Sequence, residues 1–103
     1  MADAVWIEFK QGMTEAIYRQ VNDRVNPSGT PPAGLLFHCA GPSPAGGWRI
    51  VDVWDRRETF DRFLESQVLP ALAAVIGEEA MAQGAPPEVV SWPVANHNTG
   101  PAL

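Results

Sequence analysis

Two runs of strand-forming residues, joined by a loop rich in glycine and proline, most strongly limit the folds open to this chain. The runs cover residues 34–40 and 48–54, and the loop covers residues 41–47. Two such runs separated by a short loop predict an antiparallel β-hairpin. Because successive side chains of a strand point to opposite faces, each run contributes to two surfaces. The chain is therefore expected to contain a sheet with two distinct faces.

The two faces of the hairpin differ in composition: one is aliphatic, and the other combines tryptophans with a histidine and an aspartate. We expect helices to cover the aliphatic face and to leave the other face open. With a first strand at residues 5–9, the residues predicted beneath the helices are Val5, Ile7, Phe9, Leu35, Phe37, Cys39, Val51 and Val53. The residues predicted on the open face are Trp6, Glu8, Leu36, His38, Ala40, Trp48, Ile50, Asp52 and Trp54.

The remaining segments predict two helical regions and a last strand. Thr14 is a suitable N-cap for a helix that ends before the Asn26-Pro27 pair. In the second helical region, Pro70 should kink or restart the helix because proline cannot donate the interior hydrogen bond. Gly77 should end it. Residues 78–87 are expected to form a loop with at most a helical turn, and residues 89–94 a strand.

This order of elements, β-α-β-β-α-β, is the split β-α-β arrangement of ferredoxin-like α+β domains. Right-handed crossovers place both helices on the same face of a four-stranded antiparallel sheet. At 103 residues the chain has the size of one domain, so residues 1–103 are predicted to form a single unit. A broad apolar open face is seldom left in water, and a second copy of the chain is the simplest cover. We therefore expect a homodimer.

Composition and charge exclude several classes of function. The net charge of −5 argues against nucleic acid and anionic membrane surfaces as partners, since both require clustered lysine and arginine. The single cysteine cannot form an internal disulfide, and no paired cysteines are present for zinc. No apolar run approaches the length of a membrane span, and the first residues do not resemble a signal peptide. These features predict a cytoplasmic protein that does not bind a membrane.

Several segments of the chain resemble the dimeric α/β-barrel superfamily, and within it the group related to antibiotic biosynthesis monooxygenases. These segments are residues 14–18, 34–38, 47–54, 60–63 and 69–72. The resemblance implies a dimeric α/β barrel, in which two ferredoxin-like sheets curve together and enclose cavities. Members of the superfamily include cofactor-free oxygenases of polycyclic aromatics, haem-degrading enzymes and polyketide cyclases. The fold alone does not decide among these activities.

Two departures from the superfamily limit what the resemblance implies. Haem-degrading relatives hold iron with a helix histidine, and neither predicted helix contains one, so no haem and no other cofactor is expected. The Asn-Trp-Arg constellation of the oxygenase branch has no residue-by-residue match in this chain. No catalytic residue is therefore transferred from the family.

His38 is the strongest catalytic candidate because it is the only histidine within a predicted element, and imidazole exchanges protons near neutral pH. With Gly41 opposite Gly47, His38 would lie opposite Ile50 and diagonal to Asp52. An aspartate at that distance can orient an imidazole. We predict that His38 is a general base supported by Asp52, both on the open face. The alternative is a histidine that forms a hydrogen bond at a dimer interface.

Four further residues are predicted to bind a substrate. They are Tyr18, Trp48, Trp54 and Glu8. The tryptophans could form flat walls for an aromatic molecule, although filling a dimer seam is the more ordinary use. Tyr18 could point its hydroxyl into the mouth of a cavity, although such a tyrosine is more often a residue at the edge of the core. His97 is expected in a tail that folds over a partner subunit, and no metal site is expected.

Three classes of function remain open from the sequence. The first is a cofactor-independent monooxygenase acting on a hydrophobic aromatic or polyketide-type small molecule, whose carbanion reacts with O₂. The second is a non-oxidative cyclase or isomerase that uses His38 as a general base in the same pocket. The third is a non-catalytic small-molecule-binding or assembly dimer.

Overall fold

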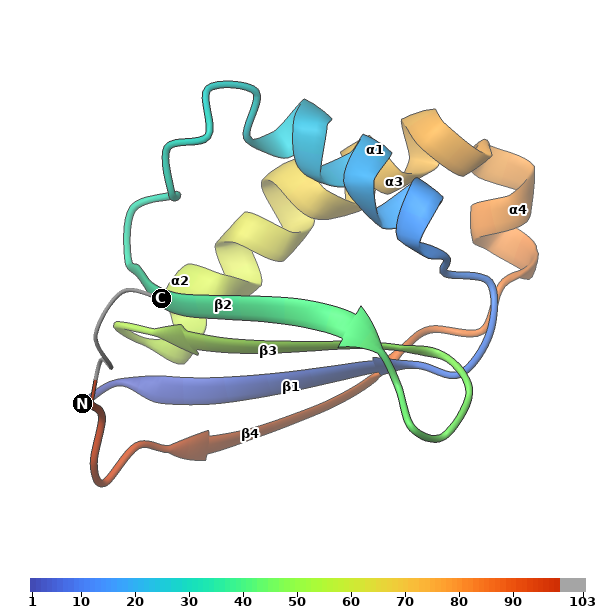
Figure 1. Cartoon of the computed structure of the whole chain (residues 1–103). Coiled ribbons are helices and arrows are strands. Elements are labelled where there is room, and N and C mark those ends of the chain that lie inside the picture. Colours follow the sequence, from blue (N-terminus) through green and yellow to red (C-terminus); the bar gives the residue numbers. More distant parts are fainter. Residues whose placement is uncertain (99–103) are drawn as a thin grey trace.

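The structure, a computed structural model, describes residues 1–98 as one sheet covered on one side by helices (Figure 1). The strands are β1 (Asp3–Phe9), β2 (Leu35–Pro42), β3 (Trp48–Trp54) and β4 (Glu88–Pro93). The helices are α1 (Glu15–Val25), α2 (Arg57–Phe63), the π-helical turn η1 (Leu64–Val68), α3 (Leu69–Ile76) and α4 (Glu78–Gln83). The strands are ordered β2-β3-β1-β4, and neighbours are antiparallel. The predicted ferredoxin-like α+β fold is confirmed.

Local sequence signals set the limits of the helices. The Thr14 hydroxyl accepts a hydrogen bond from the backbone N–H of Ile17 at 3.2 Å, which confirms the predicted N-cap of α1. The second helical region continues through η1 into α3, and Pro70 lies in the first turn of α3, where a missing N–H costs least. Gly77 ends α3 with a φ of 92°, a conformation that suits glycine. The segment after it forms the short helix α4 rather than a loop.

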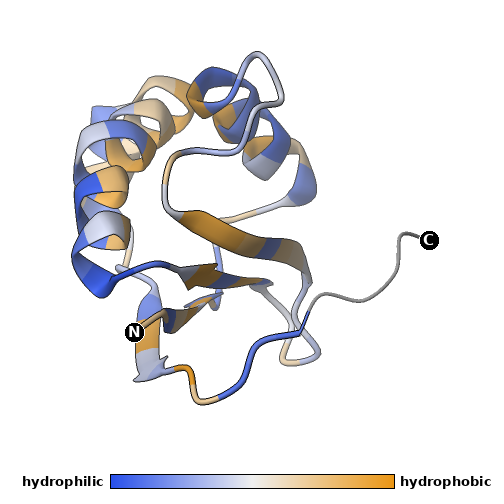
Figure 2. Cartoon of the chain, turned by 90° about the vertical axis from the view of Figure 1, so that its left-hand side faces the viewer, coloured by the Kyte–Doolittle hydropathy of each residue, from blue (hydrophilic) through white to orange (hydrophobic). Residues whose placement is uncertain are grey.

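The hydrophobic core lies between the helices and the sheet. Trp54 of β3 is 1 % exposed and packs against two helix phenylalanines, with ring centroids 6.0 Å from Phe60 and 5.2 Å from Phe63. Val5 and Ile7 of β1 complete the buried cluster. Figure 2 shows hydrophobic residues along the strands and hydrophobic stripes on the helices. The contacts of Trp54 with the helix phenylalanines show that the helices cover the face of the sheet that carries Trp54, Val5 and Ile7.

The strand register decides the face on which each polar side chain lies. Val5 pairs with Asp52, and His38 pairs with the same Asp52 from the other side. Directly paired residues of antiparallel strands point to the same face. Since Val5 lies in the core beneath the helices, His38 and Asp52 lie on the helix-covered face as well.

The predicted placement of His38 and Asp52 on the open face is therefore wrong. Trp48, Ile50, Asp52 and Trp54 do share one face, as predicted, but it is the helix-covered face of Val5 and Ile7 and not the open face. Val51 and Val53, predicted beneath the helices, lie on the open face. Because the sheet is apolar on both faces, hydrophobicity alone did not reveal which face the helices cover. His38 also lies directly opposite Asp52, not opposite Ile50 as predicted, so the pair is closer than the diagonal arrangement that we expected.

An irregularity in β2 explains a second error. The register shifts between Leu35 and Phe37, so Leu35 packs on the core while Phe37 faces away from the helices. A β-bulge inserts one extra residue and reverses the alternation beyond it. Cys39 follows Phe37 to the outer face and is exposed. Neither Phe37 nor Cys39 lies beneath the helices, contrary to the prediction.

The open face of the sheet, meaning the face that the helices leave uncovered, is largely apolar in the single chain. Trp6, Phe37, Val90 and Trp92 all lie on it and are between 37 % and 46 % exposed. The segment after β4 has no helix or strand up to residue 98, and the rest of the predicted tail lies outside the described residues. None of the described helices is both long and apolar enough to cross a membrane.

Gly47, at the end of the β2–β3 loop, is predicted to tolerate no side chain. A Cβ atom at this position would lie 1.8 Å from the backbone oxygen of Phe9, so β1 and the loop would have to separate. A Cβ at Gly41 would meet nothing within 4 Å. We expect Gly47→Ala to lower the free energy of unfolding by about 1–3 kcal/mol, measured by urea denaturation at fixed protein concentration. Equal stability of Gly47→Ala and the control Gly41→Ala would contradict the close approach.

Candidate functional site

A chain of side-chain hydrogen bonds connects three elements beneath the helices. Asp52 of β3 accepts a hydrogen bond from Nδ1 of His38 on β2, with 2.6 Å between Nδ1 and Oδ1. The other ring nitrogen of His38, Nε2, is hydrogen-bonded to the hydroxyl of Tyr18 on α1. Trp54 Nε1 donates to the second carboxylate oxygen of Asp52 at 3.1 Å. Tyr18, His38, Asp52 and Trp54 form what we call the His38 site.

The position of Asp52 determines which ring nitrogen of His38 carries a hydrogen. A carboxylate can only accept hydrogen bonds, so Nδ1 of His38 carries a hydrogen. In the neutral imidazole, Nε2 is then an acceptor, and the Tyr18 hydroxyl donates to it. Asp52 thus selects the tautomer of His38, as a buried aspartate does in a hydrolase triad.

Solvent exposure of the hydrogen-bonded side chains rises from Asp52 to His38. The side chain of Asp52 is 8 % exposed and that of His38 is 34 % exposed. β2 is an edge strand of the sheet, so His38 lies near the border of the covered face. The buried end of the site is therefore the carboxylate, and the accessible end is formed by the imidazole and the phenol.

Aromatic packing holds Tyr18 in place. Its ring is nearly parallel to the His38 ring, with an interplanar angle of 7° and a centroid separation of 6.1 Å, and the two rings meet edge to edge through their hydrogen bond. Its centroid also lies 5.3 Å from that of Trp48, which is buried. Within the described residues, the indole N–H of Trp48 has no hydrogen-bond partner.

The surroundings of Tyr18 keep its phenol protonated. Burial is the main cause that raises the pKa of Tyr18, and the negative charge of Asp52 raises it further. Arg19 acts in the opposite direction. At neutral pH the phenol therefore carries its proton and loses it only to a base that is in direct contact.

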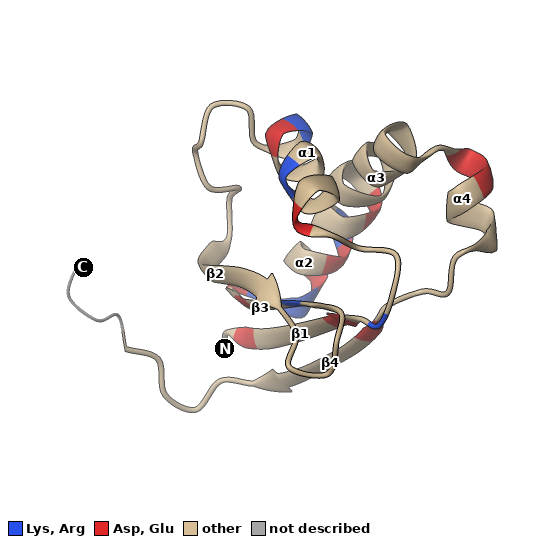
Figure 3. Cartoon of the chain, turned by 45° about the vertical axis from the view of Figure 1, so that its right-hand side comes forward, with Lys and Arg blue, Asp and Glu red and all other residues tan. Residues whose placement is uncertain are grey.

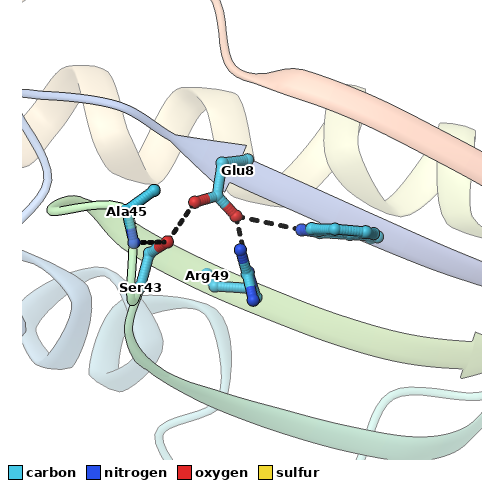
Figure 4. Close-up of polar contacts among 5 residues, drawn as sticks. Glu8, Ser43, Ala45 and Arg49 are labelled. Carbon is cyan, nitrogen blue, oxygen red and sulfur yellow. Dashed lines mark hydrogen bonds and ion pairs between the residues drawn. The ribbon is translucent and has the colours of Figure 1, made fainter.

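Glu8, which was predicted to bind substrate, lies on the opposite face of the sheet. Its carboxylate accepts hydrogen bonds from Arg49 Nε at 2.7 Å, from Trp6 Nε1 at 2.9 Å and from the Ser43 hydroxyl (Figure 4). The Arg49 guanidinium also lies 4.6 Å from the centroid of the Trp6 ring. The hydrogen bond from Arg49 is the main cause that lowers the pKa of Glu8 to about 2, and those from Ser43 and Trp6 add to it. This group, the Glu8 cluster, ties β1 to β3 and to the β2–β3 loop.

The structure thus brings together five of the six predicted site residues. Tyr18, His38 and Asp52 are joined by hydrogen bonds, and Trp48 packs against Tyr18. Trp54 is too deeply buried to form a wall for a ligand, and it contacts Asp52 instead. The sequence analysis did not predict the contact between Tyr18 and His38, because the sequence does not indicate which turn of α1 lies above β2.

Two surface hollows lie outside the His38 site. One of about 230 Å³ lies between the residues just before β2 and the segment from the end of β3 through α2, and its lining includes Asp55, Arg56 and Arg62. The other, of about 290 Å³, lies between the end of β1 and the start of β4 and includes Lys10. Figure 3 shows that the charged residues of α4 are acidic, whereas α1 carries both signs. Within residues 1–98, no His, Cys, Asp and Glu side chains form a group of three that could hold a metal ion.

Comparison with known proteins identifies the fold. No family model and no curated protein matches the sequence. Among solved structures, Rv0793 from Mycobacterium tuberculosis is similar over 96 % of this chain and 100 % of its own, with 15 % identity and a TM-score of 0.63. A candidate antibiotic biosynthesis monooxygenase from Chloroflexus aurantiacus is similar over 97 % of this chain and 100 % of its own, with 19 % identity and a TM-score of 0.59.

A third similar structure bears on assembly. It is a dimeric ferredoxin-like protein of unknown function from Thermobifida fusca, with 12 % identity, 90 % of each chain covered and a TM-score of 0.54. At these identities the similarity establishes a shared fold. The predicted resemblance to antibiotic biosynthesis monooxygenase-like proteins is confirmed at the level of structure.

The low pKa of Glu8 predicts a specific response of stability to acid. A carboxyl group with a pKa of about 2 in the folded chain and about 4.5 in the unfolded chain stabilises the fold above pH 4.5, and this contribution is lost as the pH falls through 2. In Glu8→Gln, the free energy of unfolding should be lower at neutral pH and should change less between pH 4.5 and 2. Urea denaturation across this range measures both effects. Glu65→Gln, on the exposed surface of η1, controls for the loss of one carboxylate, and a Glu8→Gln profile parallel to that of the control would contradict the assignment.

Proposed function

We propose that the protein is an enzyme that removes a proton from a hydrophobic aromatic or polyketide-type small molecule, and that the His38 site supplies the base. The observation that carries the proposal is the 2.6 Å hydrogen bond between His38 Nδ1 and the buried Asp52 carboxylate. Asp52 orients the imidazole and stabilises the imidazolium that forms when His38 accepts a proton. A histidine that served packing alone would not need a buried carboxylate held in place by a second donor.

The proposed reaction is a monooxygenation without a bound cofactor. Removal of a proton from an activated CH₂ group leaves a carbanion, which transfers electrons to O₂. The CH₂ carbon becomes a carbonyl carbon, one oxygen atom enters the product and the other leaves as water, so the substrate supplies all four electrons. Similarity to a candidate antibiotic biosynthesis monooxygenase supports this chemistry over other uses of a base.

Anthrone is a suitable probe because it is a flat tricyclic ketone with one acidic CH₂ group. We expect the protein to accelerate O₂ uptake with anthrone, measured with an oxygen electrode. His38→Gln should lower the rate about 100-fold or more, since general base catalysis contributes at least that much. His97→Gln, which removes the other histidine, is the matched control and should retain the wild-type rate.

Two outcomes contradict the proposed oxygenation. Exchange of the anthrone CH₂ protons with D₂O without O₂ uptake would indicate a proton-transfer enzyme of the cyclase or isomerase class. Equal rates of O₂ uptake for wild-type protein and His38→Gln would show that His38 takes no part in the reaction.

We further propose that the protein acts as a homodimer whose subunits meet through their open faces. Monomers rarely leave an apolar surface of this kind in water, and two-fold self-association is the commonest way to cover it. Trp6, Phe37, Val90 and Trp92 supply the exposed apolar area. The dimeric protein from Thermobifida fusca, which shares the fold, supports this arrangement.

A charge placed on the open face should separate the dimer. Wild-type protein is expected to sediment with twice the mass of the chain, and Val90→Glu with the mass of one chain, because a buried unpaired carboxylate is costly. Leu69→Glu is the matched control, since Leu69 is similarly exposed but lies on α3. A monomeric wild-type protein, or dissociation of Leu69→Glu alone, would contradict an interface between open faces.

A further inference from the structure

The hydrogen bond between Tyr18 and His38 has a consequence for how a substrate reaches the base. The substrate-side nitrogen of His38 is Nε2, because Nδ1 is turned towards Asp52. Nε2 is already occupied by the Tyr18 hydroxyl. A molecule that approaches the site therefore meets a phenol oxygen whose proton is directed at a base.

We propose that Tyr18 is the catalytic group that contacts the substrate, and that His38 and Asp52 act through it as a proton relay. In the relay, the substrate proton moves to the Tyr18 oxygen while the phenol proton moves to His38 Nε2. The imidazolium formed in this way is stabilised by the Asp52 carboxylate. The substrate loses one bond to hydrogen, Tyr18 exchanges one for another, and His38 gains one, so no external oxidant or reductant takes part.

Three observations support Tyr18 as the outer member of the relay. The phenol, the imidazole and the carboxylate lie in sequence on three different elements, α1, β2 and β3. The side chain of Asp52 is 8 % exposed and that of His38 is 34 % exposed, so a ligand reaches the group from the end formed by His38 and Tyr18. The near-parallel orientation of the Tyr18 and His38 rings and the packing of Tyr18 on Trp48 hold the hydroxyl in line with Nε2.

The raised pKa of Tyr18 makes the relay testable. Burial, Asp52 and Cys39 all raise this pKa and Arg19 lowers it, so free tyrosinate is scarce at neutral pH. The phenol oxygen can then act as a nucleophile only if His38 takes its proton at the same time. Reactivity of Tyr18 towards an electrophile consequently reports on the relay without any turnover of substrate.

The probe for this reactivity is phenylmethanesulfonyl fluoride at pH 7. The Tyr18 oxygen forms a bond to sulfur, fluoride leaves and the phenol proton passes to His38 Nε2. Tyr18 is the only tyrosine in the chain and Lys10 the only lysine, so mass spectrometry after digestion reads each site separately. Lys10 serves as an internal reference for the reactivity of the reagent.

We expect Tyr18 to be labelled in wild-type protein, and at least about tenfold more slowly in His38→Gln and Asp52→Asn, since a phenol without a base is a weak nucleophile. Labelling of Lys10 and of the control His97→Gln should be unchanged. Circular dichroism shows whether each variant is folded. If His38→Gln does not fold, Asp52→Asn still tests the relay. Equal labelling of Tyr18 in wild-type protein and both folded variants, or no labelling at all, would overturn the relay.

This inference rests on the proposed function, but the two can fail separately. Rapid labelling of Tyr18 in a protein that neither takes up O₂ with anthrone nor exchanges its protons would refute the proposed reaction and leave the activated phenol intact. Loss of anthrone turnover in His38→Gln, with Tyr18 unreactive, would keep His38 as the base and remove Tyr18 from the chemistry.

Discussion

The pairing of β1 with β3 determines the side of the sheet to which every polar residue of the two strands belongs. Val5 opposite Asp52 and Glu8 opposite Arg49 send one carboxylate beneath the helices and the other to the open face. A shift of one residue would exchange the two faces. Two hydrogen-bonded groups oppose such a shift, since it would leave Asp52 and Glu8 without their partners.

The buried carboxylates of Glu8 and Asp52 are stabilised by different sets of hydrogen-bond donors. A buried carboxylate is costly unless hydrogen bonds or a counter-charge satisfy it. Glu8 is satisfied by a guanidinium, an indole and a hydroxyl, all of which belong to the structure around it. Asp52 is satisfied by an indole and an imidazole, and the imidazole continues to a phenol. Only the Asp52 group ends in side chains that can exchange a proton with a ligand, and this difference separates a structural cluster from a candidate active site.

The order of the strands and of the two main helical regions, and the grouping of His38 with Asp52, could be predicted from the sequence, but the face on which the pair lies could not. Alternation in residues 34–54 correctly placed His38, Trp48, Asp52 and Trp54 on one face. It did not show which face, because Val51, Val53 and Phe37 are as apolar as the residues beneath the helices. The bulge at Leu36 carries no glycine or proline that would reveal it, and it moved Phe37 and Cys39 to the open face. The contact of Tyr18 with His38 depends on how α1 lies across the sheet, which is a tertiary property.

The most direct test of the His38 site is the tautomer of the His38 ring, read from its ¹⁵N chemical shifts by NMR at a pH where the ring is neutral. Comparison with His97→Gln assigns the signals, since the chain has two histidines. Hydrogen bonds to Asp52 and Tyr18 predict a hydrogen on Nδ1 and none on Nε2. A ring with its hydrogen on Nε2, or shifts averaged between the two tautomers, would contradict the site.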